Sequence, residues 1–165
     1  MAARLLDDDS IETILRGLDA AAQATVARVR ATSANSGEAL AGMPLLIFAL
    51  IAAQQRATGA YDLIDAVSRL SGRPVRPPTV YRAIDQLIAR KLVARLASRN
   101  AFVACAHPGH SHDCVLLVCD KCGRTAELED GRLDKMILED VRRTGFEPRH
   151  RTLEVEGTCK ACRGV

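Results

Sequence analysis

Aromatic residues are scarce in this chain: it has no tryptophan, two tyrosines and three phenylalanines among 165 residues. Aromatic side chains therefore cannot form most of a hydrophobic core. Since 48% of the residues are hydrophobic, a packed core must be built from leucine, valine, isoleucine and alanine, a composition that favours helices. The length allows one large domain or two small ones.

Long apolar runs are also missing near the N-terminus, where residues 1–6 lead directly into three aspartates. Such a start predicts neither a secretory signal peptide nor a membrane span. We therefore expect a cytoplasmic protein with no membrane partner. In a reducing compartment, the six cysteines are expected to bind metal rather than to form disulfides.

Acidic residues are nearly absent from residues 66–100, where Asp85 alone stands against eight basic residues. The net charge of the whole chain is only +3. A basic segment inside a near-neutral protein is expected where the protein contacts the phosphates of nucleic acid. Solvated surface charge is the alternative explanation.

Four of the cysteines form two pairs with two-residue spacers: Cys119 with Cys122, and Cys159 with Cys162. This spacing lets both sulfurs of a pair point into one space, so two pairs supply four thiolates for a tetrahedral ion, expected to be Zn²⁺. A closed four-thiolate site has no open position for water, so its expected role is structural. Two disulfides or four unmodified thiols are the alternatives.

Hydrophobic spacing predicts helices followed by a β-hairpin in residues 10–105. One long helix is expected to begin at Ser10 and to fade near Thr32. Further helices are expected at 44–56, at 60–70 and from 77 onward, and hairpin strands at 92–96 and 102–105. This order is that of a winged helix-turn-helix, in which the fourth helix lies in the major groove of DNA.

The fourth helix is the candidate recognition helix. Four apolar residues recur along it at helical spacing and are expected to be buried: Val80, Ile84, Leu87 and Ile88. Tyr81 and Arg82 then face away from the core. The Arg82 guanidinium can bind guanine O6 and N7 together, which favours base contact. Tyr81 could instead pack its ring at the helix start.

Composition changes at residues 106–113, which hold three of the four histidines. We place the domain boundary here. Residues 1–106 are predicted to form a winged-helix DNA-binding domain, with an N-terminal extension at 1–9 and a hinge loop at 106–113. Residues 107–165 are predicted to form a dimerisation and metal-binding domain, with strands near 115–118, 124–128 and 153–155 and a helix ended by Gly145. A module of this size is marginal alone, and metal and dimerisation are the usual remedies.

Four segments together carry a resemblance to a known family: Ala60-Tyr61-Asp62-Leu63-Ile64, residues 77–84 (Pro-Pro-Thr-Val-Tyr-Arg-Ala-Ile), residues 119–123 (Cys-Asp-Lys-Cys-Gly) and the Cys159-x-x-Cys162 pair. The chain resembles the ferric uptake regulator family, and within it the zinc uptake regulator branch. The resemblance implies an α+β fold, with an N-terminal winged helix-turn-helix domain that reads an operator. A small C-terminal α/β domain would dimerise and hold metal, including the four-cysteine zinc site.

DNA contacts are the first set of residues that the resemblance implies. It places Tyr61, Tyr81 and Arg82 at DNA-contact positions. Tyr61 is expected on a phosphate or a thymine methyl group. Arg76, like Arg95 and Arg99, is expected either to contact the DNA backbone or to be ordinary surface charge.

Metal ligands are the second set. The resemblance places Cys119, Cys122, Cys159 and Cys162 on structural zinc ligands, and Cys105, His112 and Glu127 on regulatory zinc ligands. Ala94 stands where the branch usually has a ligating histidine, so the fourth regulatory ligand is expected to be His110, or else His107. A thiolate at Cys105 favours zinc over iron, although a buried inert cysteine is the alternative there. At least two Zn²⁺ ions per chain are expected, and His150 is a candidate for a third site.

One further departure concerns the second helix. Residues 43–46, Met-Pro-Leu-Leu, replace the Thr-Pro-Gln-Arg that usually begins this helix in the family. The replacement removes a basic residue near the expected DNA surface.

These observations predict a zinc-responsive transcriptional repressor that binds double-stranded operator DNA as a metal-loaded homodimer and controls zinc uptake genes. It is expected to have no enzymatic activity and no small-molecule substrate. The alternatives are an iron- or peroxide-responsive regulator of the same family and a non-regulatory zinc-stapled interaction module. A zinc-dependent nucleobase deaminase would need a His-x-Glu element and a proline before its cysteine pair, and the sequence has neither.

Overall fold

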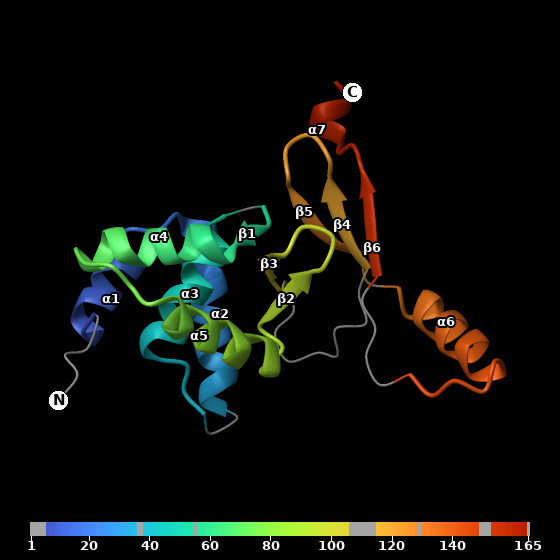
Figure 1. Ribbon diagram of the computed structural model, residues 1–165, viewed down its shortest axis with the longest axis horizontal. Helices are drawn as coiled ribbons and strands as arrows, with labels where there is room; N and C mark the ends of the chain where they lie inside the picture. Colours follow the sequence, from blue (N-terminus) through green and yellow to red (C-terminus); the bar gives the residue numbers. More distant parts are fainter. Residues whose placement is uncertain are drawn as a thin grey trace. The chain divides into compact units, whose positions relative to one another are not determined.

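The computed structural model of the chain (Figure 1) describes residues 6–35, 38–54, 56–105, 115–128, 130–148 and 153–164. The chain divides into two compact units, Met1–His110 and Ser111–Val165. The predicted domain boundary and the hinge loop 106–113 fall within residues 106–114, outside the described residues. Among the described residues, no helix is both long enough and apolar enough to span a membrane.

The first unit is a winged helix-turn-helix, as predicted. It contains the helices α1 (Asp8–Arg16), α2 (Ala20–Asn35), α3 (Gly42–Ala53), α4 (Ala60–Ser71) and α5 (Pro77–Ala89) and the strands β1 (Thr58–Gly59), β2 (Val93–Leu96) and β3 (Ala101–Ala104). The strands form an antiparallel sheet in the order β1-β3-β2. The short strand β1, which directly precedes α4 and pairs with β3, was not predicted.

The predicted long first helix is wrong, because two helices occupy that segment. Gly17 ends α1, and its N–H donates to the carbonyl of Ile14 at 3.0 Å. Asp19 then begins α2 by accepting a hydrogen bond from the Ala22 N–H at 2.7 Å. Both helices bury apolar residues in the same core, so the hydrophobic spacing continues across the break and hides it. The N-cap of α1 is Asp7 rather than Ser10.

Helix α3 is the centre of the first unit. It contacts α1, α2, α4, α5 and β3. The helix begins and ends a few residues earlier than the predicted range of 44–56. Its neighbours surround it, so its side chains are apolar in every direction. Leu45 and Leu46 are only 2% and 0% exposed. A glutamine and an arginine at these positions would be buried here, which explains the departure of residues 43–46 from the family pattern.

Helix α5 begins at Pro77, as predicted, and packs on α3, α4 and β2. Val80, Ile84 and Leu87 are buried, as expected. Ile88 is 36% exposed, so its predicted burial is wrong. At 100° per residue, Ile88 lies ~80° around the helix from Val80, at the edge of the buried face.

The second unit is a small α/β structure. It contains β4 (Val115–Cys119), β5 (Thr125–Leu128), α6 (Gly131–Arg143), β6 (Leu153–Gly157) and the short helix α7 (Lys160–Arg163). The sheet has the order β5-β4-β6, in which β4 pairs antiparallel with β5 and parallel with β6. Gly145, with φ of +79°, closes the C-terminal end of α6 by donating its N–H to the Arg142 carbonyl at 2.9 Å. The α+β fold is therefore the predicted one.

Candidate metal centre and nucleic-acid interface

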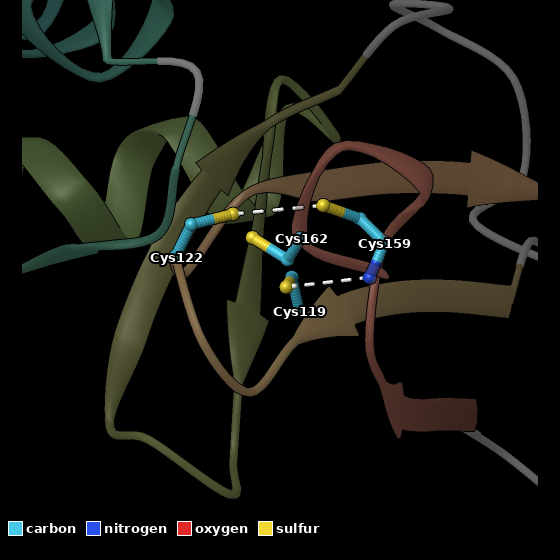
Figure 2. Close-up of side chains that lie close together, drawn as sticks. All are labelled: Cys119, Cys122, Cys159 and Cys162. Carbon is cyan, nitrogen blue, oxygen red and sulfur yellow. Dashed lines mark hydrogen bonds between the residues drawn. The ribbon is translucent and has the colours of Figure 1, made fainter. Parts of the chain in front are cut away.

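Four cysteines converge at one end of the second unit's sheet (Figure 2). Cys119 is the last residue of β4, Cys122 lies in the turn to β5, Cys159 precedes α7, and Cys162 lies within α7. Their sulfur atoms all lie within 4.8 Å of one another. The structure thus brings together all four residues that the sequence predicted as structural zinc ligands.

The local fold explains this convergence. Parallel pairing places Cys119 opposite Gly157, so Cys159 emerges two residues beyond the strand beside the first cysteine pair. In the turn after β4, Gly123 adopts a φ of +71° and donates its N–H to the Cys119 carbonyl at 3.0 Å. A left-handed conformation of this kind is readily adopted by glycine, which accounts for Gly123 directly after Cys122.

Two residues that sequence reasoning missed join the two halves of the cluster. The Asp120 N–H donates to the Gly157 carbonyl at 2.9 Å. The Thr158 hydroxyl donates to Asp120 Oδ1 at 3.1 Å. Asp120 therefore holds the chain before Cys159 against the turn that follows Cys119. The sequence did contain a signal for Asp120. It lies between Cys119 and Cys122, and Thr158 directly precedes Cys159, so both residues could have been expected near the cluster.

The geometry of the cluster fits a tetrahedral thiolate site. Metal–sulfur bonds of ~2.3 Å in a tetrahedron place the sulfurs ~3.8 Å apart. The Cys122 and Cys159 sulfurs are 3.8 Å apart. Four sulfur donors with no oxygen or nitrogen ligand suit Zn²⁺ rather than Mg²⁺ or Ca²⁺.

The thiols of the cluster differ in acidity. The backbone N–H groups of Cys159, whose nitrogen is 3.4 Å from the Cys119 sulfur, and of Cys122 lower the pKa of Cys119 to about 6. The hydrogen bonds of Cys162 with the neighbouring sulfurs, first with Cys122, raise its pKa to about 12. The Cys119 thiolate therefore forms readily, whereas Cys162 keeps its proton until a cation balances the charge.

The predicted regulatory ligands are distributed over both units. Cys105 directly follows β3 in the first unit, is 1% exposed, and donates its N–H to the Leu92 carbonyl at 3.0 Å. Glu127 lies on β5 in the second unit, opposite Leu116, and its Oε1 atom is buried. His107, His110, His112 and His150 lie outside the described residues. This ligand set stays a prediction.

The predicted DNA-contact residues lie on the surface of the helix-turn-helix formed by α4 and α5. Tyr61, in the first turn of α4, is 75% exposed, and Tyr81, in α5, is 39% exposed. Arg82 is also exposed, as is Arg76, the N-cap residue of α5. Tyr81 and Arg82 thus face away from the core, as expected. Within the described residues neither Arg76 nor Arg82 forms an ion pair.

Some of the basic residues in 66–100 have other contacts. Arg90, at the C-terminal end of α5, donates to the Glu38 carbonyl at 2.6 Å and lies 2.9 Å from Glu38 Oε2. Arg95 donates to Asn100 Oδ1 at 2.7 Å within the β2–β3 hairpin. Glu38 lies 52 residues from Arg90, so local charge counting could not detect that it neutralises part of the basic segment.

Comparison with known proteins gives consistent matches. The model of the Ferric uptake regulator family matches residues 47–156. The zinc uptake regulation protein of Escherichia coli (strain K12) is 30% identical over 141 residues, which cover 85% of this chain and 82% of that protein. A zinc uptake regulator solved in complex with zinc and DNA is similar with a TM-score of 0.81 and 28% identity, covering 88% of this chain and 97% of that one. The holo form of XcZur is similar with a TM-score of 0.77 and 37% identity, covering 85% and 97%.

Proposed function

Because the chain belongs to the ferric uptake regulator family, we propose that it is a zinc-responsive transcriptional repressor that binds operator DNA as a metal-loaded homodimer and controls zinc uptake genes. One observation carries this proposal: the chain shares its fold, over 88% of its length, with a zinc uptake regulator solved with zinc and DNA. The proposed location is the cytoplasm, and the proposed activity is binding rather than catalysis.

DNA recognition is assigned to the first unit. Helix α5 would enter the major groove, where Arg82 can bind guanine O6 and N7 together and Tyr81 lies beside it. Tyr61 on α4 would contact a phosphate or a thymine methyl group, and Arg76 before α5 would contact the DNA backbone. The exposure of all four side chains supports these roles.

The four-cysteine cluster is assigned to a structural zinc ion. Cys119, Cys122, Cys159 and Cys162 would hold it, and the bound ion supplies a cross-link and balances the thiolate charge. The chain itself contributes the turn at Gly123 and the Asp120–Thr158 contact, which hold the two cysteine pairs beside each other. The folding free energy of the second unit then depends on zinc.

Dimerisation is assigned to the second unit. Several apolar side chains are exposed there: Leu128, Met136, Phe146 and Val155. On helix α6, Leu133, Ile137 and Val141 are only half-buried, and α6 is amphipathic. Exposed apolar surface of this extent on one small unit supports an interface with a second copy. A homodimer presents two recognition helices to two half-sites of an operator.

The regulatory site is assigned to Cys105, His112 and Glu127 together with His110 or His107. Such a ligand set takes groups from both units. Zinc would therefore bind one arrangement of the two units more tightly and shift the population toward it. By reciprocity, operator DNA would tighten regulatory zinc by the same factor. With the structural site, this gives at least two zinc ions per chain.

A combined measurement tests the proposed function. A duplex selected from a random pool by the zinc-loaded protein would be titrated in gel shifts against buffered free zinc, and zinc content would be measured in parallel. We expect two or more zinc ions per dimer subunit and an operator affinity that rises with free zinc. Duplex binding that is unaffected by zinc, or a preference for iron in the same assay, would contradict the proposal.

A further inference from the structure

The turn between α4 and α5 is held by two serine hydroxyls from the last turn of α4. Ser68 Oγ accepts a hydrogen bond from the Val75 N–H at 3.0 Å, in a partly buried position. Ser71 Oγ lies 3.0 Å from the Arg73 carbonyl and 3.3 Å from the Ser68 carbonyl, and it donates to one of them at a time. The turn thus has side-chain contacts as well as backbone ones.

The N-terminus of α5 is favoured by the fixed backbone angle of Pro77 but has few hydrogen bonds. Its N-cap, Arg76, makes no side-chain capping hydrogen bond. Pro77 and Pro78 follow, and neither has a backbone N–H to anchor. The last residue held before the helix is Val75, whose side chain is buried and whose N–H is bound by Ser68. The Ser68 hydroxyl therefore holds the chain just before Pro77, the residue at which α5 begins.

This hydrogen bond joins α4 to the residue two positions before α5, and these two helices carry the proposed DNA-contact residues. Tyr61 lies on α4 with Ser68, whereas Tyr81 and Arg82 lie on α5. We propose that Ser68 is a positioning residue for DNA recognition, whose hydroxyl, with that of Ser71, fixes the start of α5 against α4 so that Arg76 and Arg82 are prepositioned for DNA. The inference rests on the proposed DNA-binding function.

Base contacts and phosphate contacts respond differently to a loosened turn. A bidentate contact to a base edge requires a fixed side-chain position, whereas a phosphate contact carries no sequence information and tolerates displacement. Without the Ser68 hydroxyl, the turn has to be ordered when DNA binds, and that ordering lowers affinity. Operator binding should weaken more than binding to random DNA.

The test compares zinc-loaded Ser68→Ala with the parent, with Ser68→Thr, which restores a hydroxyl, and with Thr25→Ala. Thr25 is the matched control, because its hydroxyl bonds to the Ala21 carbonyl at 3.0 Å within α2, away from the turn. We expect Ser68→Ala to bind the selected duplex about 3- to 10-fold more weakly, the range of one net hydrogen bond. Binding to a random duplex should change by less than about 2-fold, since phosphate contacts dominate it. Ser68→Thr and Thr25→Ala should bind like the parent.

Amide hydrogen exchange provides a second measurement that needs no DNA. The Val75 amide should exchange faster in Ser68→Ala than in the parent, whereas the Leu92 amide, which donates to the Leu87 carbonyl at 2.9 Å, should not change. Unchanged Val75 exchange, or equal losses of affinity on the selected and random duplexes, would overturn the proposal. A parent protein that binds no duplex would overturn the repressor function, and the Val75 comparison would still decide whether Ser68 holds the turn.

Discussion

The N–H of Cys105 donates to the carbonyl of Leu92 at 3.0 Å, and the N–H of Leu92 in turn donates to the carbonyl of Leu87 in α5 at 2.9 Å. Two consecutive backbone hydrogen bonds therefore connect Cys105, a proposed regulatory ligand, with α5, the proposed recognition helix. Leu92 and Cys105 are both buried, so these bonds are shielded from water. A metal that binds the Cys105 sulfur would therefore act on a residue that is hydrogen-bonded, through Leu92, to α5.

Replacement of the Cys105 thiol should abolish the zinc response without removing the structural ion. Cys105→Ala and His112→Ala are each expected to bind the selected duplex as weakly with zinc as the parent does without it. Zinc content should fall by one ion per chain, because Cys105 is not in the four-cysteine cluster. A Cys105→Ala protein with the full zinc-dependent gain in affinity would show that this cysteine is only a core residue.

The fourth regulatory ligand can be identified with two histidine variants. We expect His110→Ala to reduce the zinc response strongly and His107→Ala to reduce it less, because a tetrahedral site with three protein ligands leaves one position to fill. The measurement is zinc-dependent duplex binding at fixed structural zinc content. If both variants respond like the parent, then water or His150 is the better candidate.

Loss of one structural thiolate should unfold the second unit. Cys119→Ser removes a ligand from the cluster, and structural zinc contributes on the order of 10 kcal/mol to the folding of small zinc domains, more than such a unit can lose. Circular dichroism, zinc analysis and size-exclusion chromatography should show a partly unfolded, zinc-poor monomer. Cys105→Ala serves as the control for cysteine replacement outside the cluster. The structural assignment fails if Cys119→Ser remains a folded dimer with full zinc content.

Two arginine variants should distinguish a contact to a base from a contact to the DNA backbone. Arg82→Ala is expected to reduce discrimination between operator and random DNA by ~1 to 3 kcal/mol, the value of one bidentate base contact. Arg95→Ala, which removes a hairpin arginine bonded to Asn100, should weaken both duplexes alike. Competition gel shifts at one salt concentration provide the comparison. Equal losses on both duplexes for Arg82→Ala would assign this residue to phosphate.

Zinc affinity of the four-cysteine cluster should rise with pH, because thiolates rather than thiols bind the metal. Within the folded cluster, the pKa of Cys162 is raised to about 12, so zinc must displace the proton of this thiol at neutral pH. Cys119, with a pKa of about 6, is already ionised at neutral pH and binds its proton only in more acidic solution. Below about pH 6, zinc binding should therefore release about one more proton. The slope of the logarithm of zinc affinity against pH should increase by about one there. Chelator competition across this range measures the slope, and an affinity independent of pH would contradict the assignment.

Local signals explain which parts of the structure were predictable. Pro77 and the spacing of Val80, Ile84 and Leu87 identified α5, and the two short cysteine spacers identified the metal cluster, since both depend on neighbouring residues. The break at Gly17 was missed because buried residues on either side keep one periodicity. The Arg90–Glu38 contact was missed because a partner 52 residues away leaves no periodic trace in the sequence. The Ser68–Val75 hydrogen bond was missed because it depends on the conformation of the turn between α4 and α5.

The parallel pairing of β4 with β6 has a consequence for the order of folding. In the first unit, the β2–β3 hairpin and the α4–α5 pair join elements that are neighbours in the chain, and such contacts form quickly. The β4–β6 pair joins Val115 to Leu153, across a crossover that contains α6, and closing a loop of this kind is slow. Cys122 and Cys159 lie 37 residues apart in the chain, and the segment between them contains most of this crossover and β6. Zinc bound by both cysteines would keep this segment closed while β4 and β6 align. The rate at which newly synthesised repressor becomes able to bind DNA would then depend on the supply of the metal that it senses.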